Sequence, residues 1–198
     1  SLVSEWFSPK AAELQLEDYK PGDKLIPFKV LDGTFKGSDL VGIRYHQLIP
    51  WFKPLEGDAF RVIPGDYVST DEGTTGIVHI APTCGADDKK VAAAAGIPPM
   101  MVLDKNGNPQ PQVDHDGRFC LLEDLDPEYV ATHVAPEYKE YAGRFVKNAF
   151  DDSLPKDAPT LDIDLCMMMK MDGRAFKIQK HVHSYPHSWR TDKPVLYY

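Results

Sequence analysis

His79 and Asp88 are the two residues of this chain whose types and spacing best suit chemistry. They lie in the stretch GTTGIVHIAPTCGADD, residues 73–88, where an apolar run leads into a proline and glycine turn and two aspartates. Such a pair fits three kinds of site. These are a metal centre, a cysteine hydrolase that uses Cys84 with His79, and a pocket for a small zwitterion whose ammonium group pairs with Asp88.

Two of these sites are weakly supported by the residues. Two side chains are too few ligands for zinc, and no third or fourth ligand stands near them in the sequence. Nothing except His79 would lower the pKa of the Cys84 thiol, so a small apolar turn residue is the simpler interpretation of Cys84. Structural interpretations also exist for His79, as a half-buried strand residue, and for Asp88, as a carboxylate in the first turn of a helix.

A strand, a turn and a helix must position this pair. TGIVHIA predicts a strand that ends at Pro82 and Gly85, and ADDKKVAAAAG predicts a short helix that stops at Gly96. This unit would bring an imidazole at the end of a strand and a carboxylate at the start of a helix to the same rim of the fold. That is the geometry of a pocket.

The remaining elements predict an α+β, β-rich domain built on a barrel. Short β-like runs separated by turn signals favour a barrel or sandwich, namely KLIPFKVL, GIRYHQLIPWF and AFRVIPGDYVS. Asp126 and Pro127 predict a helix that runs to about Val134, and TLDIDLCMMMKMDG predicts another. RAFKIQKHVHSY alternates with period two, which predicts a strand with one buried face, Phe176, Ile178 and Val182, and one polar face.

Composition indicates a single domain without a membrane segment. The chain has 198 residues and a net charge of −8, which opposes nucleic-acid binding driven by diffuse positive charge. No apolar run approaches the roughly 20 residues that span a bilayer. The start of the chain has no signal-peptide pattern, and Cys84, Cys120 and Cys166 form no CxxC pair. We therefore expect reduced thiols and a cytoplasmic protein.

Several of these segments together resemble the editing insertion of isoleucyl-tRNA synthetases. Residues 73–88 are similar to its signature GTG-x-VH-x-AP-x-x-G-x-DD, and HVHSYPHSWRTDKPVLYY is similar to the strand that returns to the catalytic domain. DGRFCLLEDL, YAGRFVKN and RAFKIQKHVHSYPH extend the similarity over most of the chain. The related valine and leucine insertions typically differ at His79 and lack the ending at residues 85–88, so the isoleucine type is favoured.

The resemblance implies a barrel-type editing domain with peripheral helices over residues 1–183 and a return strand over residues 184–198. Its activity would be hydrolysis of valine attached to isoleucine-specific tRNA. Valine lacks one methylene of isoleucine, and a single pocket in this enzyme family is known to distinguish the two only about 150-fold. A second site that hydrolyses the wrong ester therefore adds fidelity. A non-catalytic RNA-binding or structural part of the synthetase is the alternative.

The resemblance also assigns roles to single residues. Asp88 would hold the ammonium group of the misattached valine, and His79 would line the pocket, help to exclude the larger side chain and position the terminal adenosine or the water. The substrate-binding set implied in this way is Thr74, Thr75, Gly76, His79, Asp87 and Asp88. The basic residues expected to guide the single-stranded acceptor end of the tRNA are Arg174, Lys177, Lys180 and His181. The ester is already activated, so no protein nucleophile is required.

Four departures from the family pattern limit these expectations. The threonine-rich strand of the opposite pocket wall is absent, so the pocket should be incomplete. Ser188 and Thr191 stand where many relatives have zinc-binding cysteines, so we expect no metal. GTTG at residues 73–76 has one residue more than GTG. The signatures of the catalytic domain are also absent, so ATP and Mg²⁺ would be cofactors of the full-length enzyme only, and the rest of the synthetase chain would be a partner.

Overall fold

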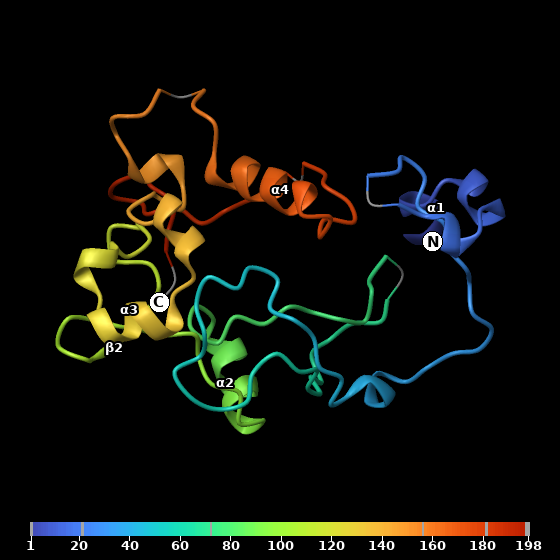
Figure 1. The fold of residues 1–198 in the computed structure, drawn as a ribbon, viewed down its shortest axis with the longest axis horizontal. Coiled ribbons are helices and arrows are strands. Elements are labelled where there is room, and N and C mark those ends of the chain that lie inside the picture. Colours follow the sequence, from blue (N-terminus) through green and yellow to red (C-terminus); the bar gives the residue numbers. More distant parts are fainter. Residues whose placement is uncertain (1, 21, 72, 156, 181, 197–198) are drawn as a thin grey trace.

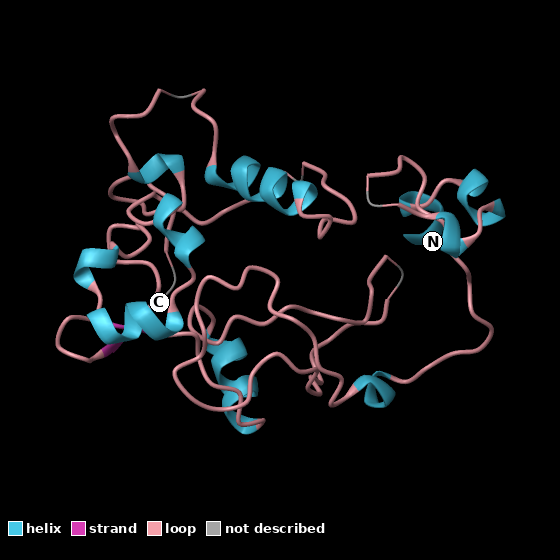
Figure 2. Ribbon diagram, in the orientation of Figure 1, coloured by secondary structure: helices cyan, strands magenta, loops and turns pink. Residues whose placement is uncertain are grey.

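The computed structural model describes residues 2–20, 22–71, 73–155, 157–180 and 182–196 (Figure 1). Its α-helices are α1 (Leu2–Trp6), α2 (Ala86–Ala94), α3 (Pro127–His133) and α4 (Leu161–Met171). The strands β1 (Val102–Leu103) and β2 (Pro109–Gln110) form one antiparallel pair. Single 3-10 turns occupy Pro9–Glu13, Leu16–Asp18, Gly37–Leu40, Leu122–Asp124, Pro136–Glu140 and Asn148–Phe150. Loops connect these elements over most of the chain (Figure 2). Within the described ranges, no helix is long and apolar enough to cross a membrane.

The three longer helices form where the sequence predicts them. The carboxylate of Asp126 accepts the backbone N–H of Tyr129 at 2.7 Å and thereby caps α3, and Pro127 occupies its first turn. The helix α2 begins directly after Gly85 and is followed by Gly96, whose φ of 68° is a left-handed conformation that suits glycine. Local capping and stop signals therefore set these boundaries.

The prediction of a mixed helix and strand fold is confirmed, but the described residues form no barrel. Residues 42–45 and 60–62 come closest to the predicted strand pairing, with the Val62 N–H donating to Ile43 at 2.8 Å and the Tyr45 N–H donating to Phe60 at 3.0 Å. A single bridge between Arg44 and Arg61 results. KLIPFKVL and TGIVHIA form no strand, because nothing described beside them completes a ladder.

The predicted buried face of residues 174–185 is wrong. Phe176, Ile178 and Val182 are 47%, 46% and 82% exposed. An alternating pattern buries one face only where a second layer covers it, and among the described residues only the Phe176 end of this face has aromatic neighbours. The Phe176 ring lies 6.4 Å from the Trp6 ring and 5.2 Å from the Phe7 ring, so the N-terminal segment covers part of this face.

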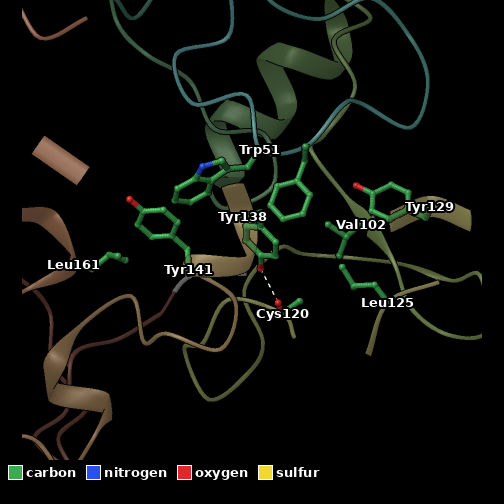
Figure 3. Close-up of a cluster of buried hydrophobic side chains, with 9 residues drawn as sticks. Trp51, Val102, Cys120, Leu125, Tyr129, Tyr138, Tyr141 and Leu161 are labelled. Atoms are coloured by element: carbon green, nitrogen blue, oxygen red, sulfur yellow. Dashed lines mark hydrogen bonds between the residues drawn. The ribbon is translucent and has the colours of Figure 1, made fainter. Parts of the chain in front are cut away.

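An aromatic core gathers segments that are far apart in the sequence (Figure 3). The side chain of Tyr138 is fully buried, and its hydroxyl donates to the Cys120 carbonyl at 2.7 Å. Its ring centroid lies 4.4 Å from that of Phe52, and the centroids of Trp51 and Tyr141 are 4.3 Å apart. The other buried members are Val102, Leu125, Tyr129 and Leu161.

The core also fixes the segments that lead toward the turn after His79. Trp51 accepts the N–H of Ala135 at 2.8 Å, and the Lys53 N–H donates to His133 at 2.9 Å. The segment before Trp51 and the segment before Val102 are therefore both anchored at their ends by buried residues. They are available to form walls of a site outside the core.

We predict that the protein loses stability above pH 10. Burial raises the pKa of Tyr129 to about 12 and also raises the pKa of Tyr138. An unfolded tyrosine ionises near pH 10, whereas the folded one keeps its proton, so the unfolded state is favoured as pH rises through this range. Each such tyrosine lowers the free energy of unfolding by at most about 1.4 kcal/mol per pH unit. Urea unfolding at pH 8, 10 and 11 measures this slope, and Tyr129→Phe should make it shallower; equal slopes for variant and wild type would contradict the prediction.

Candidate functional site

A cavity of about 480 Å³ lies where the residues around His79 face the segment that precedes the aromatic core. Its lining is mostly apolar, with polar groups from His46, Arg61, His79 and Gln112. This combination of an apolar enclosure with a few polar groups is typical of small-molecule sites. The lining residues are 45–49, 59–61, 79–84, 97, 98, 100, 111–113 and Leu196.

Two side-chain hydrogen bonds shape the wall that contains His79. The Thr83 hydroxyl donates to the Met100 carbonyl at 3.1 Å, which joins the turn before α2 to the loop after it. The Asp88 carboxylate accepts the Ala81 N–H at 2.8 Å, which ties the start of α2 to the residues before the turn. Hydrogen bonds therefore fix this turn both to the start of α2 and to the loop after α2.

His79 and Asp88 lie on either side of one turn, where the Asp88 carboxylate accepts the Ala81 N–H, but the strand predicted around His79 does not form. His79 is exposed and lines the cavity, whereas Asp88 is half-buried behind the turn and is not part of the lining. The Oδ2 atom of Asp88 is occupied by the Ala81 N–H, and Oδ1 meets no hydrogen-bond donor among the described residues. A role for Asp88 in holding a ligand stays a prediction, because its side chain does not line the cavity.

The other predicted substrate-binding residues lie outside the cavity lining. The Thr74 hydroxyl donates to the Asp71 carbonyl at 2.8 Å, and the Thr75 hydroxyl donates to the Ile77 carbonyl at 2.9 Å. Gly76 adopts a φ of 70°, and Asp87 is exposed in the first turn of α2. These hydroxyls serve the local turn, and a role in substrate binding stays a prediction for all four residues.

The predicted tRNA-binding residues have mixed surroundings. Arg174 donates to the Leu48 carbonyl and pairs with Asp172. The Lys177 ammonium lies 3.4 Å from the Glu5 carbonyl and 6.0 Å from the centre of the Trp6 ring. Lys180 is exposed. His181 lies outside the described residues. Arg174 and Lys177 therefore join distant segments of the chain, and their binding of RNA stays a prediction.

Cys84 lines the same cavity as His79, but its environment does not favour a nucleophile. Burial raises the pKa of the Cys84 thiol, so the thiolate is disfavoured at neutral pH. The thiol is therefore a neutral part of the wall. This agrees with its interpretation as a small apolar turn residue.

The return segment folds back on itself. The Ser188 N–H donates to Lys193 at 2.9 Å, the Val195 N–H donates to Pro186 at 3.0 Å, and Leu196 reaches the cavity. Across the ranges that the structure covers, no group of three or more histidine, cysteine or acidic residues could hold a metal ion. Ser188 and Thr191 instead accept backbone N–H groups through their hydroxyls at 3.4 Å each.

Sequence reasoning missed several residues that line the cavity, among them His46, Phe60, Arg61 and Gln112. His46 and Arg61 belong to runs that the sequence predicts as strands, and nothing in the runs themselves marks a site. Only the tertiary approach of residues 45–49 to residues 79–84 brings them together. The mixture of polar and aromatic residues in GIRYHQ was the one available signal.

Isoleucine–tRNA ligases are similar to this chain over its full length. The protein of Bacteroides fragilis is 61% identical over 199 residues, which are 100% of this chain and 17% of that protein. The protein of Bacteroides thetaiotaomicron is 53% identical over 219 residues, which are 100% of this chain and 19% of that protein. The cytoplasmic enzyme of Arabidopsis thaliana is 34% identical over 95% of this chain and 13% of its own length.

No protein-family model matches the chain. The similarity to the bacterial ligases nevertheless covers the whole of this chain. It spans 17% to 19% of the length of those longer proteins. The chain therefore belongs to the isoleucine–tRNA ligase family and corresponds to one part of these enzymes.

Proposed function

We propose that this chain is the editing part of an isoleucine–tRNA ligase, which hydrolyses valine from isoleucine-specific tRNA in the cytoplasm. The proposal is supported by the membership of the chain in this family together with the position of His79 and Asp88 beside a cavity. The cavity has a volume of about 480 Å³. The acceptor end of the tRNA would bring the ester to the cavity. The rest of the synthetase would supply amino-acid activation with ATP and Mg²⁺ and most of the contacts to tRNA.

The chemistry proposed for the site needs positioning more than a reactive side chain. An aminoacyl ester is already activated, so a held substrate and an oriented water supply most of the acceleration. Asp88 has one anchored oxygen and one that can accept the ammonium of the aminoacyl group. His79, on the cavity wall, would contact the amino-acid side chain or the water. We assign no covalent role to Cys84; burial raises the pKa of its thiol, which disfavours the thiolate.

The proposal also accounts for the missing barrel. The extended runs at residues 24–31 and 75–81 have strand-like sequences but no ladder in the described chain. We propose that other segments of the synthetase pair with them and close the barrel and the opposite wall of the cavity. Unpaired strand edges accept such partners readily, because each exposes a row of free N–H and carbonyl groups.

We predict that Asp88→Asn in the full-length synthetase slows hydrolysis of valyl-tRNA about 10- to 100-fold, because a hydrogen bond to a charged group contributes roughly 1.5–3 kcal/mol. The asparagine oxygen can still accept the Ala81 N–H, so the turn is kept while the charge is lost. Aminoacylation with isoleucine should be unchanged. Single-turnover deacylation of valyl-tRNA measures the effect.

The matched control for this prediction is Asp162→Asn. Asp162 is an exposed aspartate in the first turn of α4, so its replacement removes the same charge from the first turn of another helix, outside the cavity. Deacylation by this variant should equal that of the wild type. Equal rates for Asp88→Asn and Asp162→Asn would remove Asp88 from the site.

We predict that His79→Ala lowers the selectivity of hydrolysis between valyl-tRNA and isoleucyl-tRNA. Removing the imidazole opens the cavity wall, and one methylene in a pocket is worth about 10- to 200-fold in discrimination, so a loss on the order of tenfold is expected. The measurement compares the deacylation rates of the two esters. His115→Ala, at a histidine that does not line this cavity, serves as the control. A ratio of rates identical to that of the wild type would exclude His79 from the selectivity of the site.

We predict that Cys84→Ala keeps the wild-type rate of valyl-tRNA hydrolysis. The protonated thiol fills part of the cavity wall, and alanine can occupy that position with a small loss of packing. Deacylation assays before and after treatment of the wild-type enzyme with a thiol-alkylating reagent complete the test. Abolished hydrolysis in Cys84→Ala would support a cysteine hydrolase instead.

A further inference from the structure

The helix α2 carries Asp88 but has little hydrophobic burial to hold it in place. Its sequence ADDKKVAAA contains one branched apolar residue, and Ala92 is its only buried member. Short isolated helices are marginal in water, and most helices in proteins are fixed by packing of an apolar face. Polar contacts must therefore contribute much of what fixes the orientation of α2.

Such contacts exist at both ends of the helix. At its start, the Asp88 carboxylate accepts the Ala81 N–H at 2.8 Å. At its end, the Arg61 guanidinium donates through Nη2 to the Ala95 carbonyl at 2.6 Å. A carboxylate at the N-terminus and a cation at the C-terminus also both interact favourably with the helix dipole. The two contacts therefore fix α2 at both of its ends.

Arg61 is itself held firmly. Its side chain is 21% exposed, and its Nε lies 3.5 Å from a carboxylate oxygen of Asp58. The same carboxylate receives both terminal nitrogens of Arg44 at 2.6 Å. Arg61 also lines the cavity that His79 lines. The side chain therefore connects one cavity wall to the far end of the helix that carries Asp88.

We infer that Arg61 is a positioning residue for the candidate site: by fastening the C-terminus of α2 to the cavity wall, it sets where the Asp88 carboxylate lies relative to His79. The expected effect on catalysis rests on the proposed editing function. The role of Arg61 in fixing the end of α2 does not depend on it. Without Arg61, α2 keeps its contact to Ala81 and can turn about it. The loop after α2, which Thr83 joins through the Met100 carbonyl, would then lose its fixed distance to the opposite wall.

The test uses Arg61→Ala, Arg61→Lys and Arg44→Ala in the full-length synthetase that contains this sequence. Small misplacements of a binding group cost up to about 100-fold in rate, so we expect Arg61→Ala to lower kcat for valyl-tRNA hydrolysis about tenfold. KM should change less, because the tRNA body supplies most of the binding. Arg61→Lys should recover much of the rate, since an ammonium can still donate to the Ala95 carbonyl. Arg44→Ala removes the same charge beside Asp58 but keeps the contact of Arg61 to the Ala95 carbonyl, so it should lower the rate much less than Arg61→Ala.

A second measurement separates the fastening from the activity. Hydrogen exchange of the amides of residues 91–96, at the end of α2 and directly after it, should be faster in Arg61→Ala than in Arg44→Ala or the wild type. If the wild-type enzyme does not hydrolyse valyl-tRNA, the proposed function fails, while the exchange result still decides the fastening. If the wild type does hydrolyse it and Arg61→Ala matches Arg44→Ala in kcat, the positioning role is overturned. A parallel fall in kcat, in the affinity for tRNA and in aminoacylation, without recovery in Arg61→Lys, would equally overturn it, because that pattern indicates general destabilisation.

Discussion

The hydrogen bond between the Tyr138 hydroxyl and the Cys120 carbonyl is the central polar contact of the aromatic core on which this structure depends. It joins two loop segments in a region without extended sheet, at a point where the surrounding rings of Trp51 and Phe52 exclude water. A buried carbonyl without a donor costs about 1–3 kcal/mol, so the tyrosine both fills the core and satisfies the backbone that crosses it. Irregular segments can form a core only when side chains replace the hydrogen bonds that a sheet would have provided.

The candidate site follows the same rule at a smaller scale. No described strand forms the cavity walls around His79; side-chain bonds to backbone groups hold them, from Thr83, Asp88 and Arg61. Bonds of this kind are individually modest, with a net contribution of about 0.5–1.5 kcal/mol for neutral pairs and more for charged ones. A site assembled in this way can be adjusted by single residues without change in the core.

Local signals in the sequence predict the helices well and the strands poorly, for a physical reason. Asp126 with Pro127 and Gly96 act within a few residues of themselves, so their effect is readable from the sequence and appears in α3 and α2. A strand is stable only with a neighbour, and the alternation at Phe176 and Ile178 shows a face that could be buried but not what would bury it. The unit of His79 and Asp88 could be predicted because one turn joins them. The contributions of His46 and Arg61 could not, because they depend on an approach between distant segments.

The two adjacent aspartates at the start of α2 show why residue type alone does not define a site. Asp87 and Asp88 have the same side chain and the same favourable position near the N-terminus of a helix. Only Asp88 has an oxygen fixed by a backbone N–H, so its orientation is set before any ligand arrives, whereas Asp87 projects from the exposed face. A preorganised carboxylate loses less conformational entropy when it pairs with an ammonium group. The bond to Ala81 therefore favours Asp88 over its neighbour for the substrate-binding role that we propose.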